Sequence, residues 1–278
     1  MLATIIYGFT IGAILYFFSI GLSLTFGIMH IINFAHGMVY ATGVYLFITF
    51  FPWVHNTFIL ALLLSLAAMI PVAWLIEKFI IRRLYGEGLD YAMIATYAIL
   101  LIGTDIIKMI WGANPQPVND PVGVFLSFSG IDIPVYRILV VASAIALFLV
   151  LKGFFSRSIA GRIVVAALED LEGVRCLGLN VNRYFSIVFV IGSALAVIGG
   201  ILYAPVATAE PYMGFDILLL AFAVVIVGGM GNLSGTFWAA ILLGMVLAIT
   251  GRFWSQASHA MVFVAMAAVI VFRPSESS

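Results

Sequence analysis

The sequence predicts an all-α bundle of about eight to nine membrane-spanning helices, and three features of the chain lead to this prediction. Its residues are 64% hydrophobic and only 9% charged, whereas soluble domains are about 45–50% apolar and about 25% charged. The apolar residues gather in long runs, and many of the basic residues lie in two segments between those runs. A chain with so few charged residues cannot build a polar shell, so lipid must be the solvent for most of its surface.

The apolar runs define the expected helices, because a crossing helix needs roughly 20 apolar residues to span about 30 Å of hydrocarbon. The longer runs are Ile5–Met29, Phe34–Phe51, Phe58–Ile76, Tyr91–Trp111, Ile138–Phe155, Phe185–Tyr203 and Phe215–Gly229. Two shorter runs follow, Phe237–Thr250 and Ala260–Phe272. The first run is too long for a signal-peptide core and has no basic segment before it, so we expect it to be retained as a span. Helices are expected because each satisfies its own backbone hydrogen bonds in lipid.

The basic residues predict which loops face the cytoplasm. Glu77–Asp90 and Lys152–Arg183 are rich in Lys and Arg, whereas Gly112–Tyr136 and Ala204–Gly214 contain none. We therefore expect the first pair of segments inside and the second pair outside. Arg273 places the C-terminus inside. With nine crossings the N-terminus would lie outside, and with eight it would lie inside.

The segment Ser156–Arg183 is the most informative polar stretch of the chain. Apolar residues follow helical spacing along it, with acidic residues on the other side: Ile163, Val164, Ala167, Leu168, Leu171 and Val174 against Glu169, Asp170 and Glu172. Gly178 then offers a helix stop. The pattern predicts a short amphipathic helix at the cytoplasmic surface, which could either anchor the loop or bind a partner.

This segment resembles the cytoplasmic coupling loop of the permeases of branched-chain amino-acid ABC importers. The matching residues are Gly161-Arg162, Ala166-Ala167, Asp170 and Gly178-Leu179-Asn180-Val181, with Leu179 where the family often has Ile. The resemblance implies that the loop docks into a groove of an ATPase subunit. The residues expected to couple the two subunits are Gly161, Arg162, Ala167, Leu168, Glu169, Asp170, Leu171 and Gly178.

Two further stretches resemble motifs of the same family. Gly21–Gly27 followed by Ile32–Gly37 is similar to its N-terminal signature, and Val227–Thr236 is similar to its glycine-rich turn between late helices. The resemblance covers essentially the whole chain and is to the H-type permease subunit. It implies one permease domain over residues 1–278, with the coupling loop at 156–183 and an outward loop at 112–136.

The polar and glycine residues of these motifs are candidates for the solute pathway. Asn33 and His36 open an apolar span, where Asn33 could cap the helix and His36 could bond a backbone carbonyl, or both could line the path. The family-motif glycines are Gly37, Gly228, Gly229, Gly231 and Gly235; they permit close helix packing or an interrupted helix. Asp105 and Lys108 lie three residues apart and favour a local ion pair.

The sequence offers no enzyme chemistry. It has no GxxxxGK[ST] phosphate loop, so this chain cannot hydrolyse ATP alone. A nucleophile elbow is also absent, and His30 and His36 are spaced too awkwardly for a metal site. We expect no cofactor and no metal on this chain.

The resemblance implies an importer of the inner membrane with several partners. These are two ATPase subunits that bind ATP and Mg²⁺, a second permease (identical or similar), a periplasmic solute-binding protein and the bilayer, with no nucleic acid. Branched-chain amino acids are the family's usual cargo, while urea, short amides or aromatic acids remain alternatives. A channel or ion-coupled carrier, or a structural subunit of another complex, would explain the spans but neither the cytoplasmic helix nor the motifs.

Overall fold

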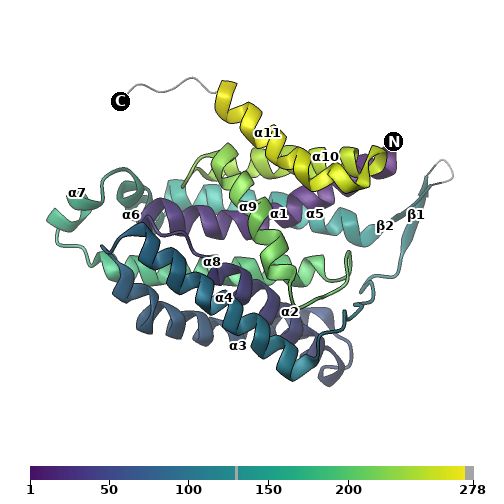
Figure 1. Ribbon diagram of the computed structural model, residues 1–278, viewed down its shortest axis with the longest axis horizontal. Coiled ribbons are helices and arrows are strands. Elements are labelled where there is room, and N and C mark those ends of the chain that lie inside the picture. Colours follow the sequence, from purple (N-terminus) through teal and green to yellow (C-terminus); the bar gives the residue numbers. More distant parts are fainter. Residues whose placement is uncertain (129–130, 273–278) are drawn as a thin grey trace.

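The computed structural model describes residues 1–128 and 131–272 and is built almost entirely of helices (Figure 1). The helices are α1 (Leu2–Met29), α2 (Ala35–Trp53), α3 (Phe58–Phe79), α4 (Leu89–Trp111), α5 (Val135–Arg157), α6 (Ile159–Glu169), α7 (Leu171–Cys176), α8 (Val181–Tyr203), α9 (Met213–Gly228), α10 (Leu233–Phe253) and α11 (Ser258–Phe272). Two 3-10 turns, η1 (Ile81–Leu84) and η2 (Ser255–Ala257), complete the helical segments. Each of the nine predicted apolar runs lies mainly within a helix.

In the described part of the chain, seven helices are long and apolar enough to cross a membrane. They exclude α2, in which Pro52 interrupts the last turn, and α9, which has only 16 residues. The structure therefore confirms a helical multi-pass protein, while the predicted eight to nine crossings are not confirmed.

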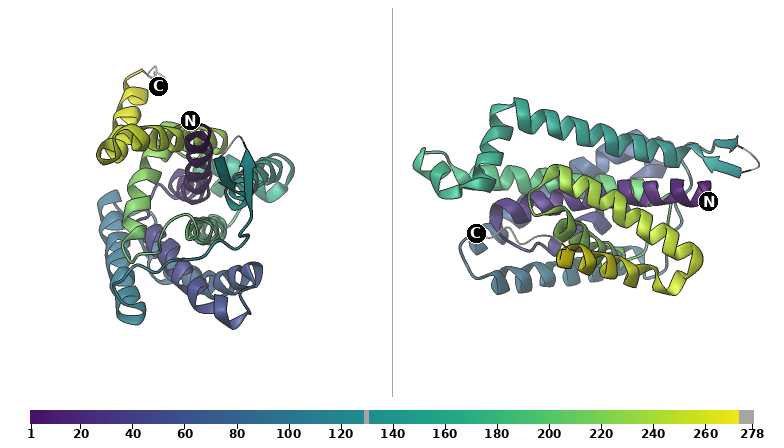
Figure 2. Two further views of the ribbon diagram at one scale, coloured as in Figure 1. Left: turned by 90° about the vertical axis from the view of Figure 1, so that its right-hand side faces the viewer. Right: turned by 90° about the horizontal axis from the view of Figure 1, so that it is seen from above.

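The centre of the bundle is formed by α1 and α8. The two helices pack against each other; α8 also packs against α2 and α3, and α1 packs against α5, α9 and α10 (Figure 2). The two helices cross at Gly21 and Gly192, where a Cβ atom on Gly21 would lie 2.6 Å from the Gly192 carbonyl oxygen. Only glycine allows the backbones to approach this closely, as at many helix contacts in membranes.

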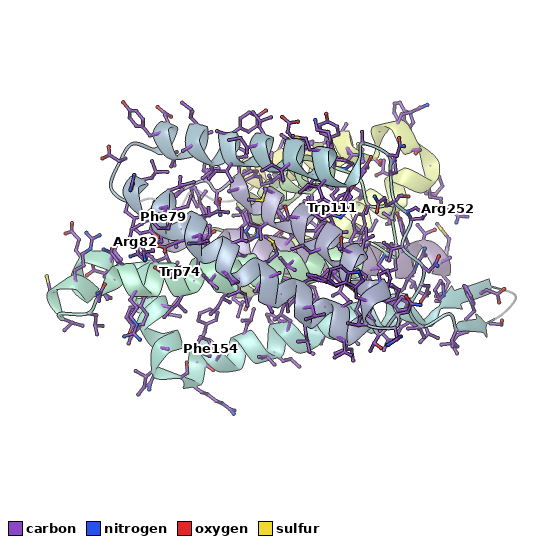
Figure 3. All side chains as sticks on the ribbon, turned by 90° about the horizontal axis from the view of Figure 1, so that it is seen from below. Trp74, Phe79, Arg82, Trp111, Phe154 and Arg252 are labelled. Atoms are coloured by element: carbon purple, nitrogen blue, oxygen red, sulfur yellow. The ribbon has the colours of Figure 1, made fainter. Side chains whose placement is uncertain are left out.

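The outer surface is apolar, as expected for a protein that faces lipid. Trp74, Phe79 and Phe154 are 40–52% exposed and project from the helices (Figure 3). In water such a surface would be costly, at about 25 cal/mol per Å² of apolar area. In a bilayer the lipid chains surround this apolar surface, so no other protein is needed to bury it.

The loops lie at the two ends of the bundle as the charge pattern predicts. At one end, Arg82 Nη2 donates to Ser186 Oγ at 2.6 Å and joins the first basic segment to α8, close to the end of the second basic segment. At the other, Gln116 and Ala209 exchange backbone hydrogen bonds of 2.8 and 3.0 Å and join the two segments without Lys or Arg. The helices α6 and α7 and the strands β1 and β2 mark these opposite ends in Figure 1. Arg273, which was expected to fix the C-terminus inside, lies outside the described residues.

The outward loop contains structure that an all-α prediction misses. Strands β1 (Phe125–Phe128) and β2 (Ile131–Pro134) pair antiparallel, with Leu126 opposite Ile133. The preceding turn is held by Asp120 Oδ1, which accepts from the backbone N–H groups of Val122 and Gly123 at 2.8 and 3.2 Å. Residues 125–128 and 131–134 of this loop therefore form a pair of antiparallel strands.

Candidate functional site

The segment 156–183, which was predicted to be a cytoplasmic loop with one helix, folds into two helices. Asp170 has extended backbone angles (φ −147°, ψ 92°), which end α6, and its carboxylate accepts from the Gly173 N–H at 2.9 Å. A second cap opens α6, where Ser158 Oγ accepts from the Gly161 N–H at 2.9 Å. Both caps satisfy backbone donors that a helix start leaves free. The break makes α6 and α7 a bent projection at one end of the bundle (Figure 2).

The expected coupling residues divide between two faces of this projection. Gly161 and Ala167 are buried, and Leu168 is half-buried. Leu168 packs where a Cβ on Gly27 or Gly231 would lie, at 2.7 and 2.8 Å, so this face holds the loop to the bundle. The exposed candidates are Arg162, Glu169, Asp170 and Gly178, with Leu171 half-exposed. Leu177, which the sequence analysis did not single out, is 78% exposed.

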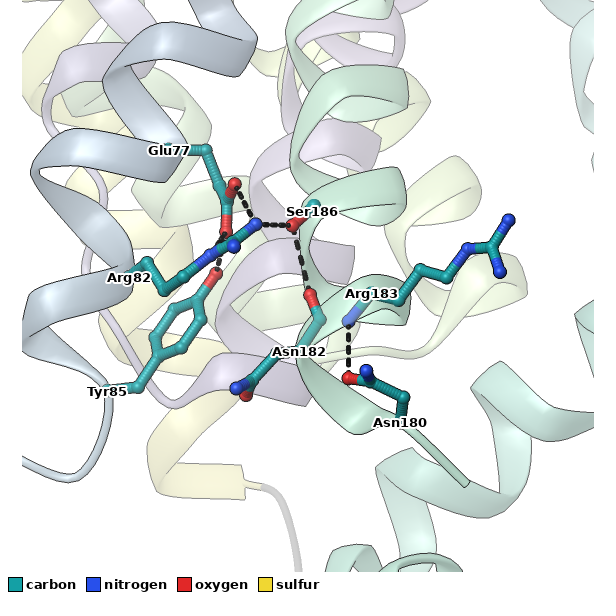
Figure 4. A network of polar contacts seen from close by, with 7 residues as sticks. All are labelled: Glu77, Arg82, Tyr85, Asn180, Asn182, Arg183 and Ser186. Carbon is teal, nitrogen blue, oxygen red and sulfur yellow. Dashed lines mark hydrogen bonds and ion pairs between the residues drawn. The ribbon is translucent and has the colours of Figure 1, made fainter. Parts of the chain in front are cut away.

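A network of polar residues braces the base of the loop (Figure 4). The buried Glu77 carboxylate accepts from Arg82 Nε and Nη2 at 3.2 and 3.0 Å and from the Tyr85 hydroxyl at 2.9 Å. Arg82 also reaches Ser186 on α8. Burial, followed by the nearby Glu77 carboxylate, raises the pKa of Tyr85, so its hydroxyl remains protonated and can donate. The end of α3 is thereby fixed to the start of α8, which follows the loop directly.

The N-terminal motif forms a buried polar junction. His36 Nε2 lies 3.1 Å from the Phe18 carbonyl oxygen, which confirms the backbone contact considered for this residue. Asn33 is 2% exposed and its side chain caps no helix, so the capping role considered for it is wrong. Neither amide atom of Asn33 finds a hydrogen-bond partner among the described residues. Such a group is costly in a membrane interior.

This junction lies about halfway along α1. Phe18 precedes the end of α1 at Met29 by 11 residues, or about 16 Å of helix, in hydrocarbon about 30 Å thick. A Cβ atom on Gly37 would lie 2.5 Å from the Gly214 carbonyl oxygen. The first turns of α2 and α9 therefore meet at about the level of the midpoint of α1. Discontinuous helices of this kind line the paths of many transporters.

The glycine-rich turn joins α9 to α10, and a hydrogen bond from this turn holds it against α1. Gly229 and Gly231 have positive φ angles of 87° and 73°, which favour glycine. The Gly231 N–H donates to Ser23 Oγ at 3.0 Å, and a Cβ on Gly228 would lie 2.7 Å from Gly235 backbone. These contacts support the packing role considered for the four glycines.

Two sets of charged residues lie on the outward half of the helices. Lys108 Nζ forms an ion pair with Asp105 at 2.6 Å, as their spacing predicts, and also reaches the Tyr212 hydroxyl at 3.1 Å. Asp216, in the first turn of α9, is exposed and was not identified from the sequence. Asp216 was overlooked because it lies inside a predicted apolar span, although a single acidic residue in such a span indicates a candidate functional site. Among the described residues no cluster of His, Cys, Asp or Glu could hold a metal ion.

Comparison with known proteins agrees with this architecture. The family model described as branched-chain amino acid transport system, permease component, matches residues 4–272. The chain is 28% identical to the high-affinity branched-chain amino acid transport system permease protein BraD of Pseudomonas aeruginosa, over 98% of this chain and 94% of that protein. It is 27% identical to LivH of Escherichia coli, a permease of the same description, over 89% of this chain and 85% of LivH.

Among solved structures, PsaBC from Streptococcus pneumoniae in complex with a Fab matches with a TM-score of 0.48 and 11% identity, over 97% of this chain and 89% of that chain. The family match spans nearly all of the chain, and its members are transport components rather than enzymes. The apolar helices place such a protein in the inner membrane. The chain therefore belongs to the family of permease components of branched-chain amino-acid transport systems.

Proposed function

We propose that this chain, with a second permease, forms the membrane pathway of an ATP-driven importer of branched-chain amino acids. The observation that carries the proposal is the match to the permease family over residues 4–272. BraD and LivH, which are similar along most of their length, are described as high-affinity branched-chain amino acid permeases. The second permease is either an identical copy of this chain or a similar chain.

The α6–α7 projection is the element that couples transport to ATP hydrolysis. Arg162, Glu169, Asp170 and Leu177 are exposed at the cytoplasmic end, where a groove of an ATPase subunit could receive them. Gly161, Ala167 and Leu168 act on the other face, where they hold the projection to the bundle. Two ATPase subunits, each binding ATP and Mg²⁺, would engage the two permeases.

Movement of this projection would reach the membrane through the helices on either side of it. Ser158 caps α6 directly after α5 ends, and Asn180 Oδ1 accepts from the Arg183 N–H at 3.3 Å to cap α8. Short, capped connections of this kind leave little slack between a docked loop and its helices. A displacement of the loop by an ATPase therefore tilts α5 and α8.

On the outward side, the hairpin loop would receive a soluble binding protein. Asp120 and Asp132 lie in this loop, and Asp132 is exposed. The Asp132 carboxylate accepts a hydrogen bond from Ser127 Oγ at 2.5 Å, which holds it on the hairpin. Carboxylates in this position can meet basic residues on the partner.

Nine crossings fit this arrangement best. If α2 and α9 cross together with the seven longer helices, the basic segments lie inside and the N-terminus lies outside. In this arrangement α9, with 16 residues, would begin within the membrane, as the discontinuous helices of transporters do. Reaction of single cysteines with a membrane-impermeant reagent, from each side, tests the count.

Affinity capture from membranes in mild detergent, followed by mass spectrometry, tests the proposed function. We expect an ATPase and a permease partner to be recovered, and a binding protein whose ligand is leucine, isoleucine or valine. Recovery of the chain alone, under conditions that keep known importers intact, would contradict the importer assignment. A binding protein specific for urea, short amides or aromatic acids would contradict only the cargo.

A further inference from the structure

Two adjoining cavities open in the outward half of the bundle. Their volumes are about 530 and 270 Å³, within or near the range of small-molecule sites, about 300–1,000 Å³. They share four lining residues, Tyr203, Ile217, Leu220 and His259. The walls come from α1, α8, α9, α10 and α11, so the space lies between helices that are distant in sequence.

Charged groups of both signs line this joined cavity. Glu210 and Asp216 line the smaller part, whereas Arg252 lines the larger part and donates to Thr4 Oγ1 at 3.1 Å. His259 lines both. Between these groups the wall is apolar, with Ile217 and Leu220 on α9.

The depth of Asp216 indicates that the cavity is wet. Asp216 follows Gly214 by two residues, or about 3 Å along the helix, and Gly214 packs on Gly37 at about the level of the midpoint of α1. An exposed carboxylate at this depth cannot face acyl chains without a large penalty. It must face water, a solute or another protein.

A second, independent observation comes from Tyr40 on α2. This side chain is fully buried, and its hydroxyl has no hydrogen-bond partner within residues 1–128 and 131–272. Tyr40 lies against Gly200 on α8, where a Cβ atom would be 3.1 Å from Tyr40 Cδ2, and Gly200 precedes Tyr203, which lines both cavities, by three residues. A polar group left unsatisfied beside a polar cavity points to a ligand or water that completes it.

We propose that this cavity binds the zwitterionic head of a small aliphatic α-amino acid on its way through the permease. The ammonium group lies toward Glu210 and Asp216, the carboxylate lies toward Arg252, and the side chain contacts Ile217 and Leu220. The proposal rests on the function proposed above and adds to it a recognition site in the permease itself.

This arrangement selects against solutes that carry only one charge. A cationic amide of leucine keeps the contact with the acids but leaves Arg252 without an anion. The corresponding 2-hydroxy acid keeps the contact with Arg252 but leaves the two carboxylates without a cation. Losing a charged hydrogen bond costs about tenfold or more in affinity.

Protection of an engineered cysteine tests the proposal. Cys176 is the chain's single cysteine, so Thr208→Cys in a Cys176→Ser background places one reactive thiol in the smaller part of the cavity. The assembled complex in nanodiscs is treated with a membrane-impermeant maleimide. We expect L-leucine to slow labelling several-fold, and leucinamide or 2-hydroxy-4-methylpentanoate to slow it far less.

Asp216→Asn should raise the leucine concentration for half-protection about tenfold. Asp105→Asn is the matched control, since Asp105 is also an exposed outward acid but does not line the cavity, and its protection should be unchanged. Ala207→Cys, at a second lining position, replaces Thr208→Cys if that variant does not assemble.

The outcomes separate this inference from the proposed function. If the complex imports leucine but leucine protects neither cysteine, the site is wrong and the importer assignment stands. Equal protection by all three compounds would also overturn the site. If the complex imports only uncharged solutes, both the cargo and the zwitterion site are wrong.

Discussion

Removing the Arg82 side chain should destabilise the protein more than removing Arg82 together with the charge of Glu77. Glu77 is fully buried and accepts three hydrogen bonds, two of them from Arg82. In Arg82→Met the carboxylate keeps only the Tyr85 hydroxyl. Breaking a buried ion pair from one side costs about 3–5 kcal/mol.

The structure places the cost at the low end of this range. The Arg82 side chain is 37% exposed, so water can replace part of its contact with Glu77. We therefore expect a loss of about 3 kcal/mol, which corresponds to a fall in Tm of about 6–12 °C for a chain somewhat longer than 150–250 residues. Glu77→Gln/Arg82→Met removes the unpaired charge, so its Tm should lie above that of Arg82→Met.

Thermal unfolding in detergent, followed by fluorescence-detected gel filtration after heating, measures both variants. Arg83→Met is the control, because Arg83 lies in the same turn η1 but makes no ion pair or side-chain hydrogen bond in the described part of the chain. A Tm for Arg82→Met within 1–2 °C of the parent (roughly the size of an ordinary surface substitution) would refute the reasoning. So would a double variant less stable than the single one.

Two further predictions address the bundle centre and the coupling loop. Gly21→Ala should cost about 1–3 kcal/mol of stability by overpacking, because its Cβ atom would meet the Gly192 backbone. Gly153→Ala is the control: its Cβ atom meets no neighbour within 4 Å among the described residues, so this variant should be neutral or stabilising in the same heating assay. Equal losses of stability in the two variants would contradict the close crossing of α1 and α8. Asp170→Leu or Gly178→Leu should lower solute uptake per ATP hydrolysed, while the protein still inserts into the membrane. The reason is that Asp170 caps α7 and that Gly178 has a φ of 75°, which favours glycine. Normal uptake in both variants would contradict the proposed docking of this loop on an ATPase.

Sequence reasoning located the helices because length and hydropathy suffice for that purpose. Each apolar run recurs as a helix, and the basic loops meet at one end as the charge pattern requires. The single amphipathic helix expected at the coupling loop was wrong in one respect. Asp170 was assigned to the polar face, but its short carboxylate caps a new helix instead and thereby breaks the expected one.

The parts that escaped prediction depend on contacts between distant segments. Ser186 lies 104 residues from Arg82, so no local pattern could link them. The depth of Asn33 and Asp216 follows from where α2 and α9 begin, and this is set by the contact of Gly37 with Gly214. A hydropathy profile counts apolar residues along the chain and does not show that a helix starts halfway through the membrane.

The position of α8 connects the two functional ends of the molecule. It begins at Val181, directly after the coupling loop, and ends at Tyr203, which lines both outward cavities. Its 23 residues extend about 35 Å, enough to cross the bilayer as one rigid rod. Because α8 packs against α1, α2 and α3, a tilt begun at the loop cannot be absorbed at its cytoplasmic end, where Arg82 fixes it through Ser186. If an ATPase moves the loop as proposed, we expect the tilt to reach Tyr203 and the cavity that Tyr203 lines to change shape.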